Sequence, residues 1–310
     1  MTVHVIVNRR ARRLDANGAL LRAIRGFAGR ATLHETRSLE ELERAARAIA
    51  AAGARAVILA GGDGSYTAGV TALRGAFQGD LPPIGLAGGG TVSTVARNVG
   101  LRGDGAKYTE RLIDAAIRGA ARERAHPTLH VADAKGASRT GFIFGTGLVA
   151  QFFDVYDAAP RQGYAEAGRI VARIFAGSFT GGALARRILT PMPCTLDVDG
   201  ARAPATAYSL IVSSVVRDLG LHMHVVHRAG EDPHRVHLVA SPLGARGLGP
   251  QLPLVLAGRR LLGRDHVDTL AATFRVTFTG DVAKYVLDGD AHAAPWVDVS
   301  AGPVLRLLTP

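Results

Sequence analysis

Short apolar runs alternate with helical patterns from residue 1 to about 122, and this alternation limits the possible folds more than any other feature. The expected strands are Val3–Val7, Ala31–Thr36, Arg55–Ala60 and Ile84–Ala87, and the expected helices are Asp15–Phe27 and Ser38–Ala52. Ser38 and Glu41 have the spacing of a capping box, and Gly53 stands where a helix terminator belongs. The alternation predicts βαβ units and an α/β domain built on a parallel sheet.

The pattern changes after His126-Pro127. Short runs rich in Val, Thr and Leu follow at residues 195–198, 209–214, 222–227, 235–240, 273–279 and 283–287. These runs predict an antiparallel all-β region, with helical interruptions at residues 166–175 and 182–189. The change of pattern places a domain boundary near residue 125.

The composition supports a folded protein in a reducing compartment. The chain has 310 residues, and 47% of them are hydrophobic, which is enough for two modest cores. Cys194 is the only cysteine, so an internal disulfide is excluded. The amino terminus leads directly into an apolar strand without a secretory signal pattern, and no run of about 18 apolar residues follows. A cytoplasmic location is therefore expected.

The strong positive charge favours an acidic partner. The formal net charge is +11 and the isoelectric point is about 10.7, which suits nucleotide phosphate, an anionic membrane surface or nucleic acid. Aromatic residues make up 5% of the chain, and neither zinc-ligand spacing nor an aromatic RNA-binding motif occurs, so no nucleic acid partner is expected. An Arg- and Ala-rich composition explains the basicity equally well. We expect peripheral contact with an anionic membrane surface, and a homodimer remains open.

Two glycine-rich corners follow neighbouring strands of the predicted parallel sheet. The first is AGGDGSYTAG, residues 60–69, and the second is GGGTVSTVARNVG, residues 88–100. Ligands of open parallel sheets bind at the carboxyl ends of the strands. Glycine lets backbone N–H groups approach phosphate oxygens, and the following helix adds the positive end of its dipole. The two corners together predict a phosphate cradle, to which Thr91 and Ser93 add hydroxyl groups.

Asp63 is the one charged side chain of the first corner. Beside a polyphosphate, its carboxylate could hold Mg²⁺ or accept a proton from an attacking hydroxyl. The alternative is a tight turn between strand and helix in which Asp63 caps the helix. The chain contains no GxxxxGK[ST] motif and no GxGxxG after its first strand, so neither a Walker loop nor a simple dinucleotide motif is present.

The two corners resemble the paired motifs GGDGT and GTGNDFARxLG of the diacylglycerol kinase catalytic-domain family, which includes sphingosine and ceramide kinase relatives. VIVNRRARRL resembles the family's opening strand, YVLDGDAH its late DGE motif, and PWVDVSAGPVLRLLTP its last strands. The resemblance covers essentially the whole chain and implies a Rossmann-like parallel α/β domain, shared with NAD kinases, followed by an antiparallel β-sandwich. The implied division is residues 1–125 for nucleotide binding and catalysis, 126–296 for the lipid substrate, and 297–310 as a segment that returns to the first domain.

The resemblance implies an ATP-dependent lipid kinase that uses Mg²⁺ and phosphorylates diacylglycerol or a sphingoid or ceramide-type lipid. The implied nucleotide-binding residues are Asn8, Arg9, Thr36, Gly61, Gly62, Gly64, Ser65, Gly89, Gly90 and Thr91. The implied catalytic residues are Asp63, Asp288 and Asp290, with Asp290 in the place of the family's catalytic glutamate. Asp232 lies in the region where the family holds a structural metal.

Some positions depart from the family's pattern. Arg9 stands where proline is usual, Ser93-Thr94 replaces Asn-Asp, and Asp290 is one methylene shorter than glutamate. These departures leave the lipid open and keep a non-catalytic nucleotide- or lipid-binding regulator as an alternative. GGDGSY also resembles the phosphofructokinase loop, and GGDG the NAD kinase corner, but the TIDND-like and NxxxxGF segments of those two families are absent.

Three smaller features have both a functional and a structural interpretation. His222 and His224 share one side of the strand expected at residues 222–227 and could bind a metal, but that strand holds no carboxylate or Cys ligand, so surface histidines are favoured. Arg9, Arg10, Arg12 and Arg13 could bind phosphate or form a solvated turn. Apolar residues within 142–153 and 252–262 could line an acyl-chain pocket or simply be core.

Overall fold

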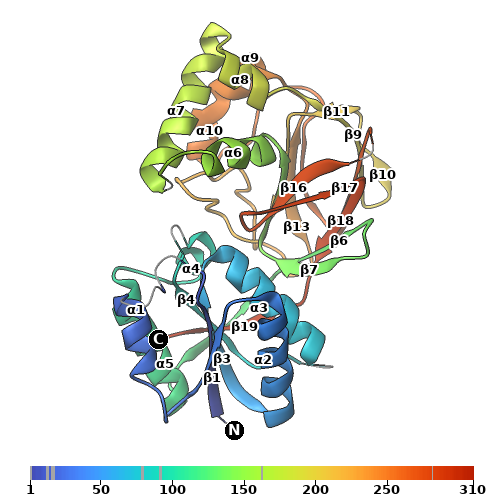
Figure 1. Ribbon diagram of the computed structural model, residues 1–310. Coiled ribbons are helices and arrows are strands. Elements are labelled where there is room, and N and C mark those ends of the chain that lie inside the picture. The colour runs from blue at the N-terminus through green and yellow to red at the C-terminus, as the bar shows by residue number, and fades with distance from the viewer. Residues whose placement is uncertain are drawn as a thin grey trace. The chain divides into compact units, whose positions relative to one another are not determined.

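The computed structural model describes residues 2–11, 14, 18–77, 80–90, 93–161, 163–280 and 282–310. The chain forms two compact units, Met1–His126 with Val304–Pro310, and Pro127–Pro303 (Figure 1). The chain passes between the units twice, at residues 126–127 and 303–304. Within the second unit, next to these points, the Thr128 hydroxyl donates to the carbonyl oxygen of Pro303 at 2.7 Å. Residues 297–303, expected from the sequence to return to the first domain, stay in the second unit because Val297–Ala301 pairs with Leu129–Asp133.

The first unit has a six-stranded sheet in the order β2-β1-β3-β4-β19-β5. Its strands are β1 Thr2–Asn8, β2 Thr32–Thr36, β3 Ala54–Gly61, β4 Ile84–Gly88, β5 Arg122–His126 and β19 Leu305–Thr309. Neighbouring strands pair in parallel except β19 and β5, which are antiparallel. Its helices are α1 Ala19–Arg25, α2 Leu39–Ala52, α3 Asp63–Ala76, α4 Thr94–Asn98 and α5 Gly105–Arg118. Helix α2 packs against α3, and α1 against α5, on opposite sides of the sheet (Figure 1).

Local sequence signals account for most of this unit. The Ser38 hydroxyl accepts the Glu41 N–H at 3.2 Å at the start of α2, and Gly53 ends the helix with a φ of 71°. The predicted parallel α/β architecture and its first four strands are confirmed. The expected helix at 15–27 is shorter and begins at Ala19, and its residues 15–17 lie outside the described part of the chain.

The second unit contains two antiparallel sheets, in the orders β10-β9-β15-β18-β6-β7, with β11 on β9, and β14-β13-β12-β8-β16-β17. The strands of the first are β6 Leu129–Asp133, β7 Ser138–Gly141, β9 Met192–Val198, β10 Ala201–Arg202, β11 Ala207–Tyr208, β15 Thr273–Phe278 and β18 Trp296–Ala301. Those of the second are β8 Ile143–Gly147, β12 Leu210–Ser214, β13 Val236–Ser241, β14 Val267–Ala271, β16 Ala283–Leu287 and β17 Asp290–Ala294. Phe144 of β8 meets Phe274 of β15 edge to face at 5.7 Å, so the sheets share a core, as a sandwich requires.

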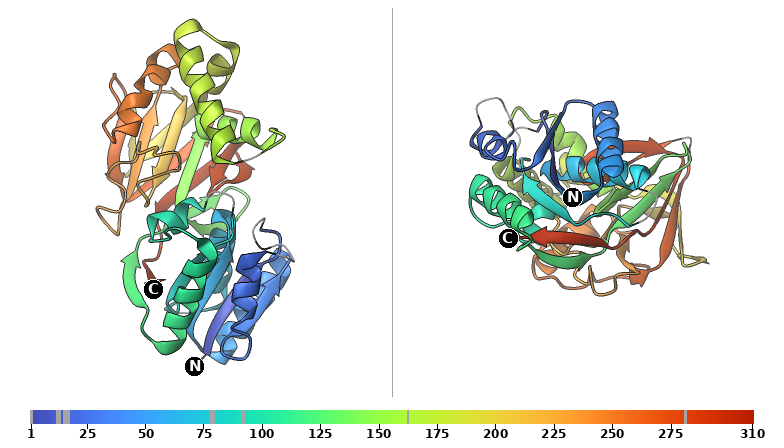
Figure 2. Two further views of the ribbon diagram at one scale, coloured as in Figure 1. Left: turned by 90° about the vertical axis from the view of Figure 1, so that its left-hand side faces the viewer. Right: turned by 90° about the horizontal axis from the view of Figure 1, so that it is seen from below.

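Helices cover one side of the second sheet (Figure 2). They are α6 Leu148–Asp157, α7 Tyr164–Thr180, α8 Ala183–Ile188, α9 Ala245–Leu248, the 3₁₀ helix η2 Gly249–Gln251 and α10 Leu252–Leu256. Their side chains pack with Leu210 and Val212 of β12 and Val239 of β13 in one core cluster. The expected helices at 166–175 and 182–189 correspond to α7 and α8, whereas α6 was not predicted.

The strand predicted at 222–227 is wrong. This segment consists of turns, and Gly220, Leu221 and His222 have φ values of 101°, 54° and 57°. These left-handed conformations are incompatible with a β-strand. Asp218 therefore comes close to both histidines, which a straight strand would not allow.

Candidate functional site

The two glycine-rich corners touch each other through their backbones. Strands β3 and β4 are neighbours, with Gly61 opposite Gly88. The Gly89 N–H donates to the Gly61 carbonyl oxygen at 2.6 Å. A Cβ on Gly90 would lie 2.6 Å from the Cα of Gly62, closer than real contacts allow. The absence of side chains on these glycines thus allows the two corners to touch at the carboxyl edge of the sheet.

Asp63 links the two corners. It is the first residue of α3, but its carboxylate accepts the N–H groups of Thr94, at 2.8 Å, and Val95, at 3.0 Å. A negative charge at this position satisfies the first N–H groups of α4. Asp63 therefore caps α4, the helix of the second corner, whereas the capping alternative considered from the sequence concerned the helix that directly follows Asp63.

Asn8 and Ser65 form a hydrogen bond between the end of β1 and the first glycine corner. The Asn8 amide donates to the Ser65 hydroxyl oxygen at 2.8 Å, and the same oxygen accepts the Gly62 N–H at 3.3 Å. The Asn8 side-chain oxygen accepts the N–H of Arg10 at 2.9 Å. These contacts tie the end of β1 to the start of α3, so Asn8 and Ser65 hold the shape of the corner.

Arg9 and Thr36 lie at the ends of β1 and β2. The Arg9 N–H donates to the Thr36 carbonyl oxygen at 2.9 Å, and the Arg9 guanidinium pairs with Glu35 at 2.8 Å. A hydrogen bond from Arg25, and then the charges of Arg25 and Arg9, hold the pKa of Glu35 below its ordinary value against the opposing effect of desolvation. The Arg9 side chain is only 11% exposed, and within the described part of the chain its buried Nε has no hydrogen-bond partner.

The structure brings together nearly all the predicted nucleotide-binding residues of the first unit. Asn8, Arg9, Thr36, Gly61, Gly62, Gly64, Ser65, Gly89 and Gly90 lie at or just beyond the carboxyl ends of β1 to β4. Thr91, Arg12 and Arg13 lie outside the described residues. Glu35 was missed by the sequence analysis, although a carboxylate next to Thr36 near the end of a strand was a readable signal.

The late motif forms a hairpin turn in the second unit. Asp288 and Gly289 connect β16 to β17 with φ values of 51° and 92°, as a two-residue turn of type I′ requires. The buried Asp288 carboxylate accepts the N–H groups of Phe142, at 2.9 Å, and Ile143, at 2.8 Å. This geometry favours a structural role for Asp288 over the catalytic role that the resemblance implied.

Asp290 has a different environment. It is the first residue of β17 and keeps an exposed surface. Desolvation by the surrounding protein, and then the negative charge of Asp157, raises the pKa of Asp290 above the ordinary aspartate value. A raised carboxyl pKa at an accessible position is typical of a general base or acid.

Asp232 makes a local turn. Its carboxylate accepts the N–H of His234 at 2.8 Å. Among the residues that the structure describes, the clusters of at least three potential metal ligands are Asp218, His222 and His224, and His227, His237 and Asp268, so Asp232 is in neither. A metal at Asp232 stays a prediction.

Comparisons with known proteins give a partial family match and a shared fold. The family model for the diacylglycerol kinase catalytic domain matches residues 2–122, whereas no curated protein matches the chain. A crystal structure of a diacylglycerol kinase from Bacillus anthracis str. Sterne is similar at a TM-score of 0.66 and 12% identity, covering 100% of this chain and 97% of that one. Yeast NADH kinase complexed with NADH is similar at a TM-score of 0.51 and 11% identity, covering 100% and 84%.

At these identities, the structural matches define the fold alone. The family match covers both glycine corners and implies a kinase. The chain therefore has the two-part fold of diacylglycerol kinase-like proteins, and its residues 2–122 match the family model of the diacylglycerol kinase catalytic domain.

Proposed function

We propose that this protein is an ATP-dependent lipid kinase that transfers the γ-phosphoryl group to a hydroxyl of diacylglycerol or of a sphingoid or ceramide-type lipid. The observation that carries the proposal is the joined pair of glycine corners inside the region that matches the diacylglycerol kinase catalytic domain. The corners present backbone at the N-terminus of the 14-residue helix α3, where phosphate groups are favoured.

The residues of this edge suit a nucleotide polyphosphate. Arg9 offers a guanidinium that is held by Glu35 and whose buried Nε has no acceptor among the described residues, so a phosphate oxygen would satisfy it. Asp63 places a carboxylate, the kind of ligand that Mg²⁺ prefers, between the two glycine corners, where its oxygens accept the N–H groups of Thr94 and Val95. Bound ATP and Mg²⁺ would supply the phosphoryl group and neutralise its charge.

Asp290 is our candidate for the general base. A lipid hydroxyl is a weak nucleophile, so a carboxylate that takes its proton assists the transfer. Asp290 is exposed, and its raised pKa brings its proton affinity closer to what that task needs. Asp288, by contrast, already binds the backbone of Phe142 and Ile143 and keeps the hairpin in place.

Phosphoryl transfer from radiolabelled ATP to a panel of acceptors tests the proposal. The panel contains diacylglycerol, sphingosine and ceramide in mixed micelles, with NAD and fructose 6-phosphate as water-soluble acceptors. We expect label in one of the lipids. Label in NAD or in the sugar phosphate would replace the proposal with a related kinase activity. Measurable ATP binding without transfer to any acceptor would favour the non-catalytic regulator.

We further propose that the protein binds anionic membranes peripherally. The net charge of +11 and the exposed side chains of Phe179, Leu256 and Leu262 support this, with exposures of 59%, 45% and 67%. No helix of the described residues has the length and apolar character to cross a bilayer. In co-sedimentation, vesicles containing phosphatidylserine should retain more protein than phosphatidylcholine vesicles, and added salt should weaken the difference. Equal retention by both vesicles would contradict the electrostatic contribution.

A further inference from the structure

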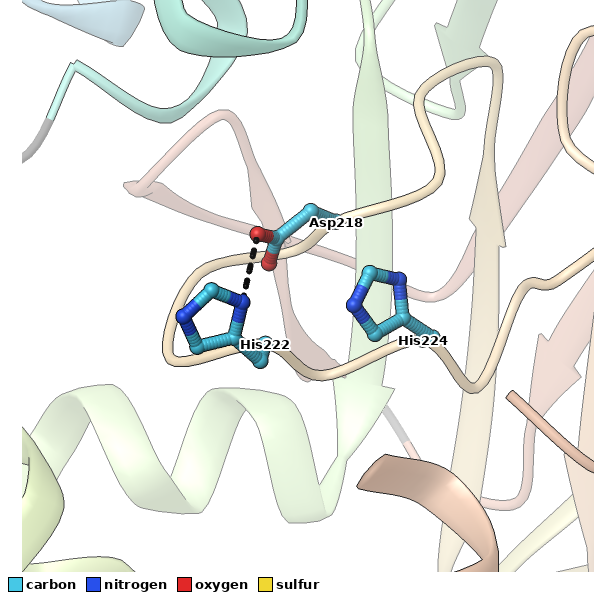
Figure 3. Close-up of side chains that lie close together, drawn as sticks. All are labelled: Asp218, His222 and His224. Carbon is cyan, nitrogen blue, oxygen red and sulfur yellow. Dashed lines mark ion pairs between the residues drawn. The ribbon is translucent and has the colours of Figure 1, made fainter. Parts of the chain in front are cut away.

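A loop of the second unit brings together three potential metal ligands that the proposed kinase site does not use. Asp218, His222 and His224 lie between β12 and β13, and their ligand atoms are all within 4.8 Å of one another. Figure 3 shows the Asp218 carboxylate facing the two imidazole rings. The His222 Nδ1 lies 3.7 Å from an Asp218 oxygen, and the two rings are nearly parallel, with centroids 6.2 Å apart.

The backbone holds this arrangement in place. The Gly220 N–H donates to the other Asp218 oxygen at 2.8 Å, and the Met223 N–H donates to the Gly220 carbonyl at 3.0 Å. The His224 N–H donates to the carbonyl of Val255 in α10 at 3.2 Å. Leu221 and His222 are left-handed, a conformation that is costly for side chains of this size. The turn that brings His222 back toward Asp218 is thus fixed by several contacts.

We propose that Asp218, His222 and His224 bind a divalent transition metal, with Zn²⁺ as the preferred ion. Two imidazoles and one carboxylate match its ligand preferences, and water completes the tetrahedron. Neighbouring ligand atoms around Zn²⁺ lie about 3.4 Å apart for bonds of about 2.1 Å. The present separations, all within 4.8 Å, need a contraction of at most about 1.4 Å. The His222 side chain is 87% exposed and has room to move toward Asp218, from which its Nδ1 is 3.7 Å away.

The second cluster is a weaker candidate because its groups already bind one another. The buried His237 ring pairs through Nε2 with Asp268 at 2.9 Å, and its Nδ1 accepts the Arg228 N–H at 3.2 Å. The Arg260 guanidinium lies 3.4 Å from Asp268 and adds a positive charge that opposes a cation. This cluster instead provides a control for the experiment.

Equilibrium titration of the full-length, tag-free protein with Zn²⁺, and with Co²⁺ for its visible absorption bands, tests the site. We expect one ion per chain and tetrahedral Co²⁺ bands. His222→Ala should weaken binding at least about tenfold. His234→Ala, at an exposed histidine of the same loop, and Asp268→Asn should bind like the parent protein.

Three results would overturn the site: no metal binding by the parent protein, unchanged binding by His222→Ala, or loss of binding in Asp268→Asn. His222 is exposed and outside every core, so a folding defect in its alanine variant is not expected, and circular dichroism checks this. The readout is independent of kinase activity, so the metal site and the proposed function can fail separately.

Discussion

Replacing Asp290 with asparagine should lower phosphoryl transfer by about 10²- to 10⁴-fold, the usual contribution of a positioned general base. Asparagine has nearly the same shape but cannot accept the proton of the lipid hydroxyl. The effect should fall on kcat, measured with saturating ATP and with the lipid that the acceptor panel identifies. Asp290→Glu, which restores the residue of the resembled family, should keep substantial activity.

The pH dependence gives a second readout of the same residue. A general base works only when it is deprotonated, so activity should fall as the pH drops through the pKa of Asp290. Because desolvation and the charge of Asp157 raise that pKa, the loss should occur at a higher pH than an ordinary aspartate gives. The acid limb of the kcat profile should disappear in Asp290→Asn.

The stability of Asp290→Asn separates catalysis from folding. A carboxyl whose pKa is raised in the folded state stabilises the fold fully below its unfolded pKa, and this contribution is lost as the pH rises through the folded pKa. Removing the charge should therefore not lower the melting temperature at neutral pH. Asp265→Asn, at an exposed position with a φ of 60°, is the matched control and should keep full activity. Full activity in Asp290→Asn would exclude Asp290 as the base.

Asp63→Ala is a less selective test. Its carboxylate holds the first two N–H groups of α4, so alanine would release the second glycine corner as well as remove a charge from the proposed phosphate site. Lost activity in that variant would not distinguish catalysis from the shape of the site. Asp290 makes the sharper test because its carboxyl is exposed, and the contacts among the described residues give it no comparable structural task.

Features with local causes were predictable from the sequence. The Ser38 hydroxyl, which accepts the Glu41 N–H, marks the start of α2, and the glycine corners follow their strands directly. The meeting of the corners also follows from parallel neighbouring strands, which place their carboxyl ends at one edge. For these reasons the α/β architecture could be anticipated, and so could the grouping of most of the proposed nucleotide-binding residues at one edge of the sheet.

Features that depend on distant partners could not be predicted. The capping of α4 by Asp63 joins two different corners, and no sequence spacing specifies it. The turns around His222 were mistaken for a strand because His-Met-His-Val-Val alternates and is rich in valine, while the left-handed residues that break the strand include a leucine and a histidine. Leucine and histidine rarely adopt a left-handed conformation, so only the tertiary contacts of the loop could reveal these turns.

Asp288→Ala should destabilise the second unit by about 2–5 kcal/mol. The substitution removes the acceptor of the Phe142 and Ile143 N–H groups, and Phe142 is fully buried. Alanine also tolerates the φ of 51° less well than aspartate does, at a cost of about 1 kcal/mol. Denaturant unfolding followed by fluorescence of Trp296, which lies in this unit, measures the change.

Asp265→Ala isolates the backbone part of this cost, because Asp265 has a similar φ of 60° but an exposed side chain. Its loss should be about 1 kcal/mol. Asp288→Asn should fall between the two, since the amide keeps the left-handed turn and one oxygen acceptor. Equal losses in Asp288→Ala and Asp265→Ala would mean that the buried hydrogen bonds contribute little. Asp288 would then return as a candidate for catalysis, because nothing structural would require its carboxylate.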